Sequence, residues 1–199
     1  NFNHPGGAGD YGDQRGTPNP DPRNIAGAVG EQKIKVRPRD DAQDCWNLQW
    51  AFDNVAAGGT VELEAGTFFI GDENTAPRRT IYMRRGLRVV GAKRGDEWLT
   101  VIRGGGQVLT PGVGGELESG PLRIVIENDN HPAVIENLWF RDWACEVVYI
   151  VSCPGFEFRG CRISNPANTA LEGKIRFVHA IWSSGVAARG DFTVENCLV

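Results

Sequence analysis

The run FRDWACE, residues 140–146, holds side chains that could bind or cleave a sugar. It places Arg141, Asp142, Trp143 and Glu146 close together after an apolar, strand-like stretch. An indole ring stacks on the apolar face of a sugar, and an arginine beside carboxylates binds hydroxyl groups or a uronate. We therefore take Arg141, Asp142 and Glu146 as candidate catalytic residues and Trp143 as a candidate substrate-binding residue. The alternative is a loop with a surface ion pair and a half-buried tryptophan.

A second group of basic residues lies in the run PRRTIYMRRGLRVVGAKRG, which contains no acidic residue. Within an acidic protein, such a patch could bind a polyanion, for example a uronic-acid polymer. Arg84, Arg85 and Arg88 are the substrate-binding candidates in this run. The alternative is that these arginines occupy outward strand and turn positions and keep the surface soluble.

His179 is the last candidate for substrate binding. An imidazole can act as acid or base near neutral pH, and Lys174 and Arg176 precede this histidine. The sequence identifies no carboxylate or nucleophile to partner it. The alternative is therefore a histidine with a structural role.

Length, charge and cysteine spacing narrow the functional classes. The chain has 199 residues, enough for one domain with a substantial core, and a formal net charge of −4 argues against a general nucleic-acid binder. No apolar run is long enough to span a bilayer. The five cysteines lack paired C-x-x-C spacing, so we expect no metal site. We expect Cys161 and Cys197 to be free thiols in the interior.

The composition divides the chain into an arm and a domain. Residues 1–32 are rich in Gly, Pro, Asn and Asp and are predicted to form an extended, flexible arm, within which NIAGAVG could lie as a strand. Residues 33–199 are predicted to form the domain. It opens with a helix at about 40–57, and strands broken by Gly, Asn and Pro fill about 60–199. The apolar face of the helix is formed by Cys45, Leu48, Phe52 and Val55.

Three phrases near the C-terminus repeat one pattern: IENLWFRD, FEFRGCRISN and FTVENCLV. A strand repeat of this size is typical of a solenoid, in which equivalent residues stack in columns. The apolar column predicted to fill the interior is Ile135, Phe158 and Val194. The column predicted to take the corner, where unusual backbone angles are needed, is Asn137, Gly160 and Asn196. The outward column, with charges of alternating sign, is Glu136, Arg159 and Glu195.

The order D-D-x-x-x-C-W-x-x-x-x-A-F, then GGTVELEAGTFFIG, then LRVVGAKRGDEWLTVIRGGG, opens the domain. This order resembles the N-terminal region of the pectate-lyase-like superfamily. The matching positions are Asp41, Gly59, Thr60, Val61, Gly66, Gly91, Thr100, Ile102 and Gly104. The resemblance runs from about Lys33 onward. It implies an all-β solenoid, namely a right-handed parallel β-helix with an N-terminal capping α-helix.

The catalytic patterns of the enzymes in that superfamily are incomplete in this sequence. The G-H-G and R-x-K phrases of the hydrolases and the Y-G-x-D-P-H phrase of the epimerases are absent. Asp129, Asp142 and Glu146, with Arg141, lack the motif that surrounds the calcium-binding carboxylates of pectate lyases. If the protein is an enzyme, the resemblance implies a polysaccharide lyase or a glycoside hydrolase. We expect no cofactor, with Ca²⁺ the exception for a lyase.

These observations predict an extracellular or cell-surface protein that binds or cleaves an acidic polysaccharide. The alternative is a non-catalytic structural subunit. No capping segment follows the last strand-like phrase, which ends at Val199, and the open end of a solenoid needs a cover. Either the sequence is a piece of a larger protein whose later coils supply that cover, or another copy supplies it. On this alternative, copies assemble head to tail through the Val199 end and through the strand Ile25–Val29.

Overall fold

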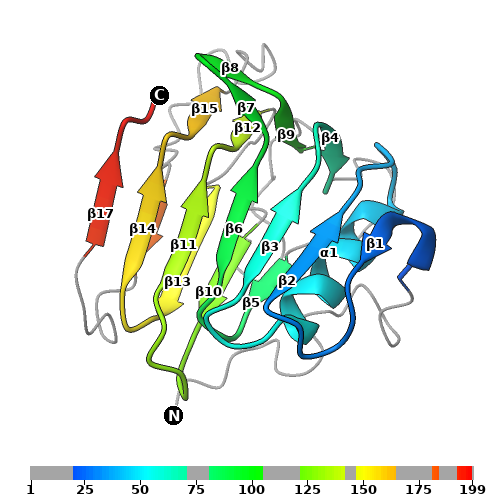
Figure 1. The fold of residues 1–199 in the computed structure, drawn as a ribbon. Helices are drawn as coiled ribbons and strands as arrows, with labels where there is room; N and C mark the ends of the chain where they lie inside the picture. Colours follow the sequence, from blue (N-terminus) through cyan, green and yellow to red (C-terminus); the bar gives the residue numbers. More distant parts are fainter. Residues whose placement is uncertain are drawn as a thin grey trace, which may run out of the picture.

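The computed structural model describes residues 20–70, 81–104, 122–141, 147–164, 181–183 and 192–198. Their strands form three larger sheets around one core and a separate two-stranded hairpin (Figure 1). Sheet A consists of β1 (Ile25–Ala26), β2 (Lys33–Val36), β3 (Thr60–Leu63), β6 (Arg88–Gly91), β11 (Ala133–Glu136), β14 (Phe156–Arg159) and β17 (Phe192–Glu195). Sheet B consists of β4 (Gly66–Phe69), β9 (Thr100–Arg103), β12 (Trp139–Arg141) and β15 (Arg162–Ser164). Sheet C consists of β5 (Ile81–Met83), β10 (Leu122–Val125), β13 (Val148–Ser152) and β16 (Ile181–Ser183). The other elements are the 3-10 turn η2 (Pro22–Asn24), the helix α1 (Gln43–Asn54) and the antiparallel hairpin of β7 (Lys93–Arg94) and β8 (Glu97–Trp98).

From β3 onward the strands follow one order along the chain: sheet A, then sheet B, then sheet C. The rounds are β3-β4-β5, β6-β9-β10, β11-β12-β13 and β14-β15-β16, after which β17 returns to sheet A. Each strand pairs in parallel with its equivalent in the next round. Residues at equivalent positions in successive rounds therefore become neighbours across the strands.

The predicted fold class, a single all-β solenoid in the form of a right-handed parallel β-helix, is wrong. The described strands belong to separate sheets, sheet A is mixed because β1 runs antiparallel to β2, and the described residues form no closed solenoid. The physical reason lies at the bends. The three corner residues between sheets A and B have φ angles of 57°, 56° and 53°, and strand pairing stops there. The repeat predicted the stacking of equivalent strands but not the division into sheets.

The strands themselves and their register agree with the repeat. Ile135 pairs with Phe158, and Phe158 pairs with Val194, as aligned from the sequence. Ile135 and Phe158 are buried, whereas Val194 is 58% exposed because no further described strand covers β17. The left-handed corner residues are those predicted: Asn137, Gly160 and Asn196. Gly and Asn adopt this conformation at low cost, so the local sequence determines where each bend occurs.

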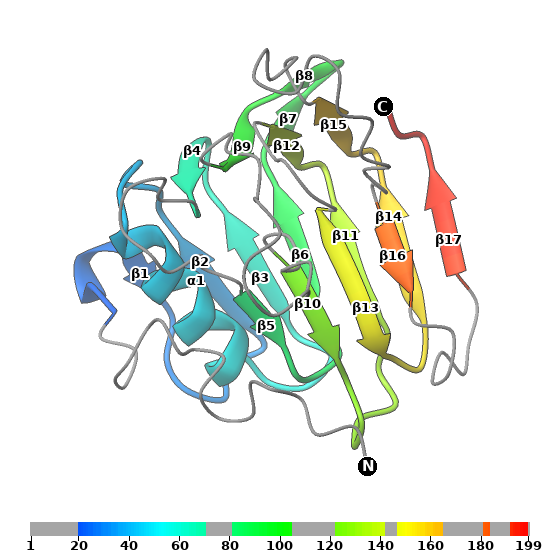
Figure 2. The same cartoon turned by 180° about the vertical axis from the view of Figure 1, so that it is seen from behind.

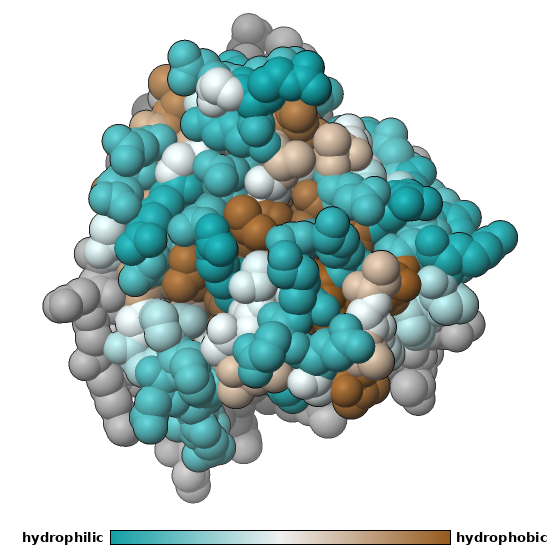
Figure 3. Space-filling model, in the orientation of Figure 1, coloured by the Kyte–Doolittle hydropathy of each residue, from teal (hydrophilic) through white to brown (hydrophobic). Residues whose placement is uncertain are grey.

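On the outer face of sheet A, arginine and glutamate side chains pair with one another. Arg159 Nε lies 3.0 Å from Glu195 Oε1, and Arg159 Nη1 lies 3.6 Å from Glu136 Oε1. Glu136 also accepts a hydrogen bond from Arg88 Nε at 2.8 Å. The alternating charges predicted for this column are confirmed, and the face is mostly hydrophilic (Figure 3).

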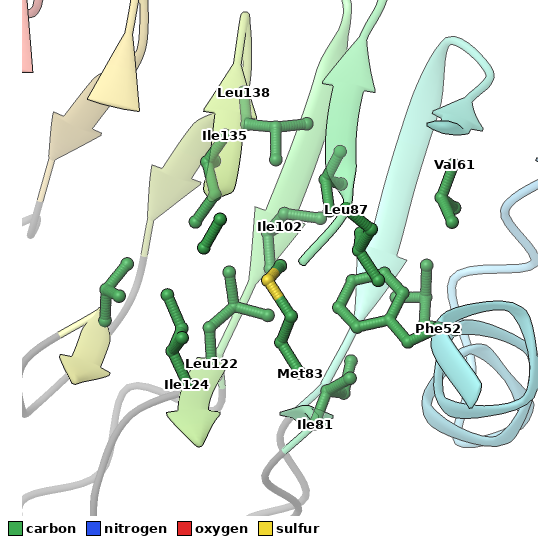
Figure 4. Packing of buried hydrophobic residues seen from close by; sticks show 14 of the residues in the cluster. Phe52, Val61, Ile81, Met83, Leu87, Ile102, Leu122, Ile124, Ile135 and Leu138 are labelled. Carbon is green, nitrogen blue, oxygen red and sulfur yellow. The ribbon is translucent and has the colours of Figure 1, made fainter. Parts of the chain in front are cut away.

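The core lies between the three sheets and α1. Alternate strand residues point inward, as Phe68, Ile102 and Phe140 do on sheet B, and all three are buried. The rings of Phe140 and Phe158 stack with centroids 5.9 Å apart. Figure 4 shows side chains from sheets A, B and C meeting those of α1. Burial of this apolar surface is the main favourable contribution to folding.

Helix α1 covers one end of this core, opposite β17 (Figures 1 and 2). The predicted helix at about 40–57 is longer than the observed one, Gln43–Asn54, because Asp40 has a φ of 58° and Val55 is extended. The predicted apolar face is confirmed: Cys45, Leu48, Phe52 and Val55 are buried. The Asp41 carboxylate accepts the backbone N–H of Gln43 at 2.8 Å at the start of the helix.

At this end, segments of the same chain bind backbone groups of β5 in sheet C, of β4 in sheet B and of β2 in sheet A. Gln49 of α1 mimics a neighbouring strand for sheet C: its Oε1 accepts the N–H of Tyr82 at 2.8 Å and its Nε2 donates to the carbonyl of Tyr82 at 3.0 Å. Asp44 Oδ2 accepts the N–H of Phe69 on the edge of sheet B at 2.9 Å. Strand β1 pairs with the edge of β2. Satisfying these groups blocks non-specific strand addition.

The segment Ile25–Val29, predicted to take part in self-association, is partly paired within its own chain. Only Ile25 and Ala26 of this segment form a strand, and they pair with Val36 and Lys35 of the same chain. Donating that strand to another copy would require its release from β2. Assembly through this segment and through the Val199 end stays a prediction.

The cysteines in the described residues are free thiols, as expected for Cys161 and Cys197. Cys161 is fully buried, and burial raises the pKa of its thiol to about 12. Its Sγ lies 3.7 Å from the carbonyl oxygen of Ile135, and Cys197 Sγ lies 3.5 Å from that of Phe158. Equivalent thiols thus contact equivalent carbonyls in successive rounds.

Candidate functional site

The outer face of sheet B gathers cationic and aromatic side chains. Inward Phe140 leaves its neighbours Trp139 and Arg141 on the outer face, and Arg162 lies beside Trp139 in the strand register. In the adjoining column, Arg103 pairs in register with Arg141. Because side chains alternate along a strand, one face of the three neighbouring strands β9, β12 and β15 collects all four residues.

Five of these side chains form a cation–aromatic ladder, which we define as Lys93, Trp98, Arg162, Trp139 and Arg141. Lys93 Nζ lies 4.2 Å from the centroid of Trp98, and Arg162 Cζ lies 5.9 Å from the same ring. Arg162 Cζ is also 4.5 Å from the centroid of Trp139, and Arg141 Cζ is 5.5 Å from that ring. These separations fall within the range of cation–π attraction. The ladder therefore alternates charge and ring across four strands.

Hydrogen bonds fix both indole rings of the ladder. Trp98 Nε1 donates to the carbonyl oxygen of Gly160 at 2.6 Å, and Trp139 Nε1 donates to Ser164 Oγ at 2.7 Å. All five members of the ladder are half-buried, so each keeps part of its surface open to solvent. A ring held in place loses little entropy when it stacks on a ligand.

Gly160 has a steric reason to be glycine. A Cβ atom there would lie 2.8 Å from Asn137 Oδ1 and 4.0 Å from Lys93 Nζ, and its φ is positive. The absent side chain leaves room beside the Asn137 amide and the Lys93 ammonium group, where Trp98 docks on the Gly160 carbonyl. Gly160 thus both forms the bend between sheets A and B and positions Trp98 in the ladder.

The electrostatics of the ladder differ from those of sheet A. Within the described part of the chain, Lys93 and Arg162 form no ion pair, whereas the arginines of sheet A face carboxylates. Arg103, beside the ladder, pairs with Asp40 at 2.7 Å and lies 4.6 Å from the ring of Phe69. Lys93 and Arg162, which lie next to aromatic rings and face no carboxylate of the described residues, suit an anionic ligand with apolar faces.

Only one predicted catalytic residue is located by the structure. Arg141 ends β12 and belongs to the ladder. Asp142, Trp143, Glu146 and His179 lie outside the described residues.

The basic candidates Arg84, Arg85 and Arg88 contact three different parts of the chain. Arg84 lies over the ring of Tyr82 at 4.6 Å and 3.9 Å from Asp53, and burial lowers its pKa. Arg85 Nη1 donates to the carbonyl oxygen of Val55 at 2.8 Å, just after α1. Arg88 pairs with Glu136 on sheet A. Their contacts therefore lie on separate elements, and a polyanion would compete with Asp53 for Arg84 and with Glu136 for Arg88.

An Asp–His pair lies in the loop between β10 and β11. His131 Nδ1 is 2.6 Å from Asp129 Oδ1, and Asp129 Oδ2 accepts the N–H of Gly86 at 2.8 Å. Burial would raise the pKa of Asp129, but hydrogen bonds from the backbone and ring of His131 and from Gly86 hold it below its usual value. A Cβ at Gly58 would lie 2.6 Å from His131 Cδ2. The pair therefore holds this loop in contact with Gly58 and Gly86.

Sequence reasoning missed most of the ladder. The alignment that placed Asn137 beside Gly160 also places Trp139 beside Arg162, so the contact between these two side chains could have been predicted from the sequence. Nothing in the sequence indicated that Trp98 reaches Gly160, which lies 62 positions further along the chain. Long-range contacts of this kind depend on the stacking of rounds rather than on local pattern.

No group of three or more His, Cys, Asp or Glu side chains in the described residues is arranged to hold a metal ion. No protein-family model, no curated protein and no solved structure matches the chain. None of the described helices is long and apolar enough to cross a membrane.

Proposed function

We propose that this protein binds an acidic polysaccharide through the cation–aromatic ladder on and beside sheet B. The observation that carries the proposal is the alternation Lys93–Trp98–Arg162–Trp139–Arg141, with ring and charge in contact at each step. Sugar rings stack on indoles, and carboxylate groups on the sugar pair with guanidinium and ammonium groups.

The ladder supports binding more directly than cleavage. General acid or base catalysis needs a titratable group near its working pH and within reach of the scissile bond. Of the candidate catalytic residues, the described part of the chain contains only Arg141, which lies against Trp139 as a ligand-binding side chain would. Acidic polysaccharides occur outside cells, so the proposal includes an extracellular or cell-surface location. The sequence resemblance to the pectate-lyase-like superfamily agrees with this class of ligand.

Calorimetry with defined polymers tests the proposal. Polygalacturonate and alginate are expected to bind, dextran is not, and affinity should fall between 50 and 500 mM NaCl because salt screens the charges. Arg162→Ala should weaken binding about tenfold, or about 1.4 kcal/mol, since Arg162 contacts both indoles. The matched control is Lys35→Ala on sheet A, where Lys35 lies 3.5 Å from Glu62. This variant should bind within twofold of wild type.

Two results would refute the proposal: equal affinity for dextran and polygalacturonate, or equal losses in the Arg162 and Lys35 variants. Repeating the titration with Ca²⁺ and measuring unsaturated products at 235 nm separates binding from lyase activity. Product formation would add catalysis to the proposal and direct attention to Asp142 and Glu146.

A further inference from the structure

The β7–β8 hairpin is an insertion at a bend that is otherwise minimal. Sheets A and B are joined by two residues at Glu64–Ala65, at Asn137–Leu138 and at Gly160–Cys161. Between β6 and β9 the connection has eight residues, Ala92–Leu99. The other connections join the same two sheets with two residues, so the extra residues are not needed to pass from sheet A to sheet B.

The hairpin is built as a stable projection. Leu99 N–H donates to the carbonyl oxygen of Ala92 at 2.9 Å, and Ala92 N–H donates to Thr100 Oγ1 at 2.8 Å, which closes its base. Gly95, with a φ of 55°, makes the two-residue turn at its tip. Figures 1 and 2 both place the hairpin beside β12 and β15, where it contributes Lys93 and Trp98 to the ladder.

We infer that the β7–β8 hairpin is a binding arm that sets the length of acidic glycan held by the ladder. It supplies one of the two indoles and one of the three cations that flank them. Trp98 lies beyond Arg162, so a chain that stacks on Trp139 must extend further to reach it. Neighbouring strands lie about 4.8 Å apart, which is comparable to the length of one sugar residue. This inference rests on the proposed function.

The test measures affinity against oligogalacturonates of increasing length. The shortened variant replaces residues 92–99 by Asn-Leu, the pair that joins β11 to β12 in the same protein. For wild type, affinity is expected to rise with length and then to level off. The shortened variant should level off at least one sugar residue earlier and bind long chains about tenfold more weakly. A second variant, Trp98→Ala with Lys93→Ala, keeps the hairpin backbone and should shift the plateau in the same direction. It provides the test if the shortened variant does not fold.

The outcomes separate the two proposals. If both hairpin variants fold and show the wild-type plateau and affinity, while Arg162→Ala still weakens binding, the hairpin inference is overturned and the binding function stands. If wild type binds no acidic chain of any length, both are overturned. A plateau that shifts to shorter chains in the folded hairpin variants, with Lys35→Ala unchanged, supports the inference.

Discussion

Asp44 should make the stability of the protein fall as pH rises between about 4 and 6. Its side chain is fully buried, with Oδ1 on the N–H of Arg39 at 2.8 Å and Oδ2 on the N–H of Phe69 at 2.9 Å. Burial raises its pKa from 3.8 to about 6, although both hydrogen bonds favour the anion. The folded state then binds a proton that the unfolded state has released, so the free energy of unfolding decreases across this window. Raising the pKa of Asp44 from 3.8 to about 6 corresponds to about 3 kcal/mol in the free energy of unfolding.

The Asp44→Asn variant isolates this contribution because it removes the titrating group and leaves the rest of the chain unchanged. Urea denaturation at pH 4, 5, 6 and 7 should show the stability difference, wild type minus variant, falling by about 3 kcal/mol from pH 4 to pH 7. The control is Gln49→Leu, another buried α1 side chain that binds a sheet edge but does not titrate. It removes both hydrogen bonds to the backbone of Tyr82 and should cost about 2–5 kcal/mol. Because Gln49 also lowers the pKa of the half-buried Asp53, this loss should rise rather than fall with pH, opposite in sign to the Asp44→Asn difference.

A flat difference for Asp44→Asn would refute the reasoning about burial. A difference that rises with pH would mean that the two N–H donors outweigh desolvation and keep the carboxylate ionised in the folded protein.

Three further expectations follow from single contacts. Gly160→Ala should lower the free energy of unfolding by about 1–2 kcal/mol, since φ is 56° at this position. It should also shift tryptophan emission, because Trp98 loses its hydrogen bond to the carbonyl oxygen of residue 160; unchanged emission would contradict that loss. Arg159→Ala should cost about 1–2 kcal/mol in low salt and less in 1 M NaCl, because it leaves carboxylates of Glu136, Glu157 and Glu195 without their shared partner; a salt-independent loss would point to packing instead. Trp98→Phe should keep ladder stacking but lose the hydrogen bond to Gly160, so calorimetry should show weaker binding than wild type and tighter binding than Trp98→Ala.

The sequence alone determined the strands, their register and the bends between them. Alternation of apolar and polar residues at period two fixes which side chains face the core, as in Ile135 and Phe158. Asn and Gly at the bends fix the backbone, because they enter the left-handed region at low cost. The apolar face of α1 is likewise a local property of three- and four-residue spacing.

Only the tertiary structure decided the division into three sheets, the covering of their edges and the site. Gln49 binds Tyr82, Arg88 binds Glu136 and Trp98 binds Gly160, at separations of 33, 48 and 62 residues. Local propensity carries no information about such pairs, because each depends on how many residues every intervening connection adds before the strands stack. The arginines that looked like one cluster in the sequence were distributed over separate elements for this reason. The ladder, in contrast, was assembled from residues scattered over four strands.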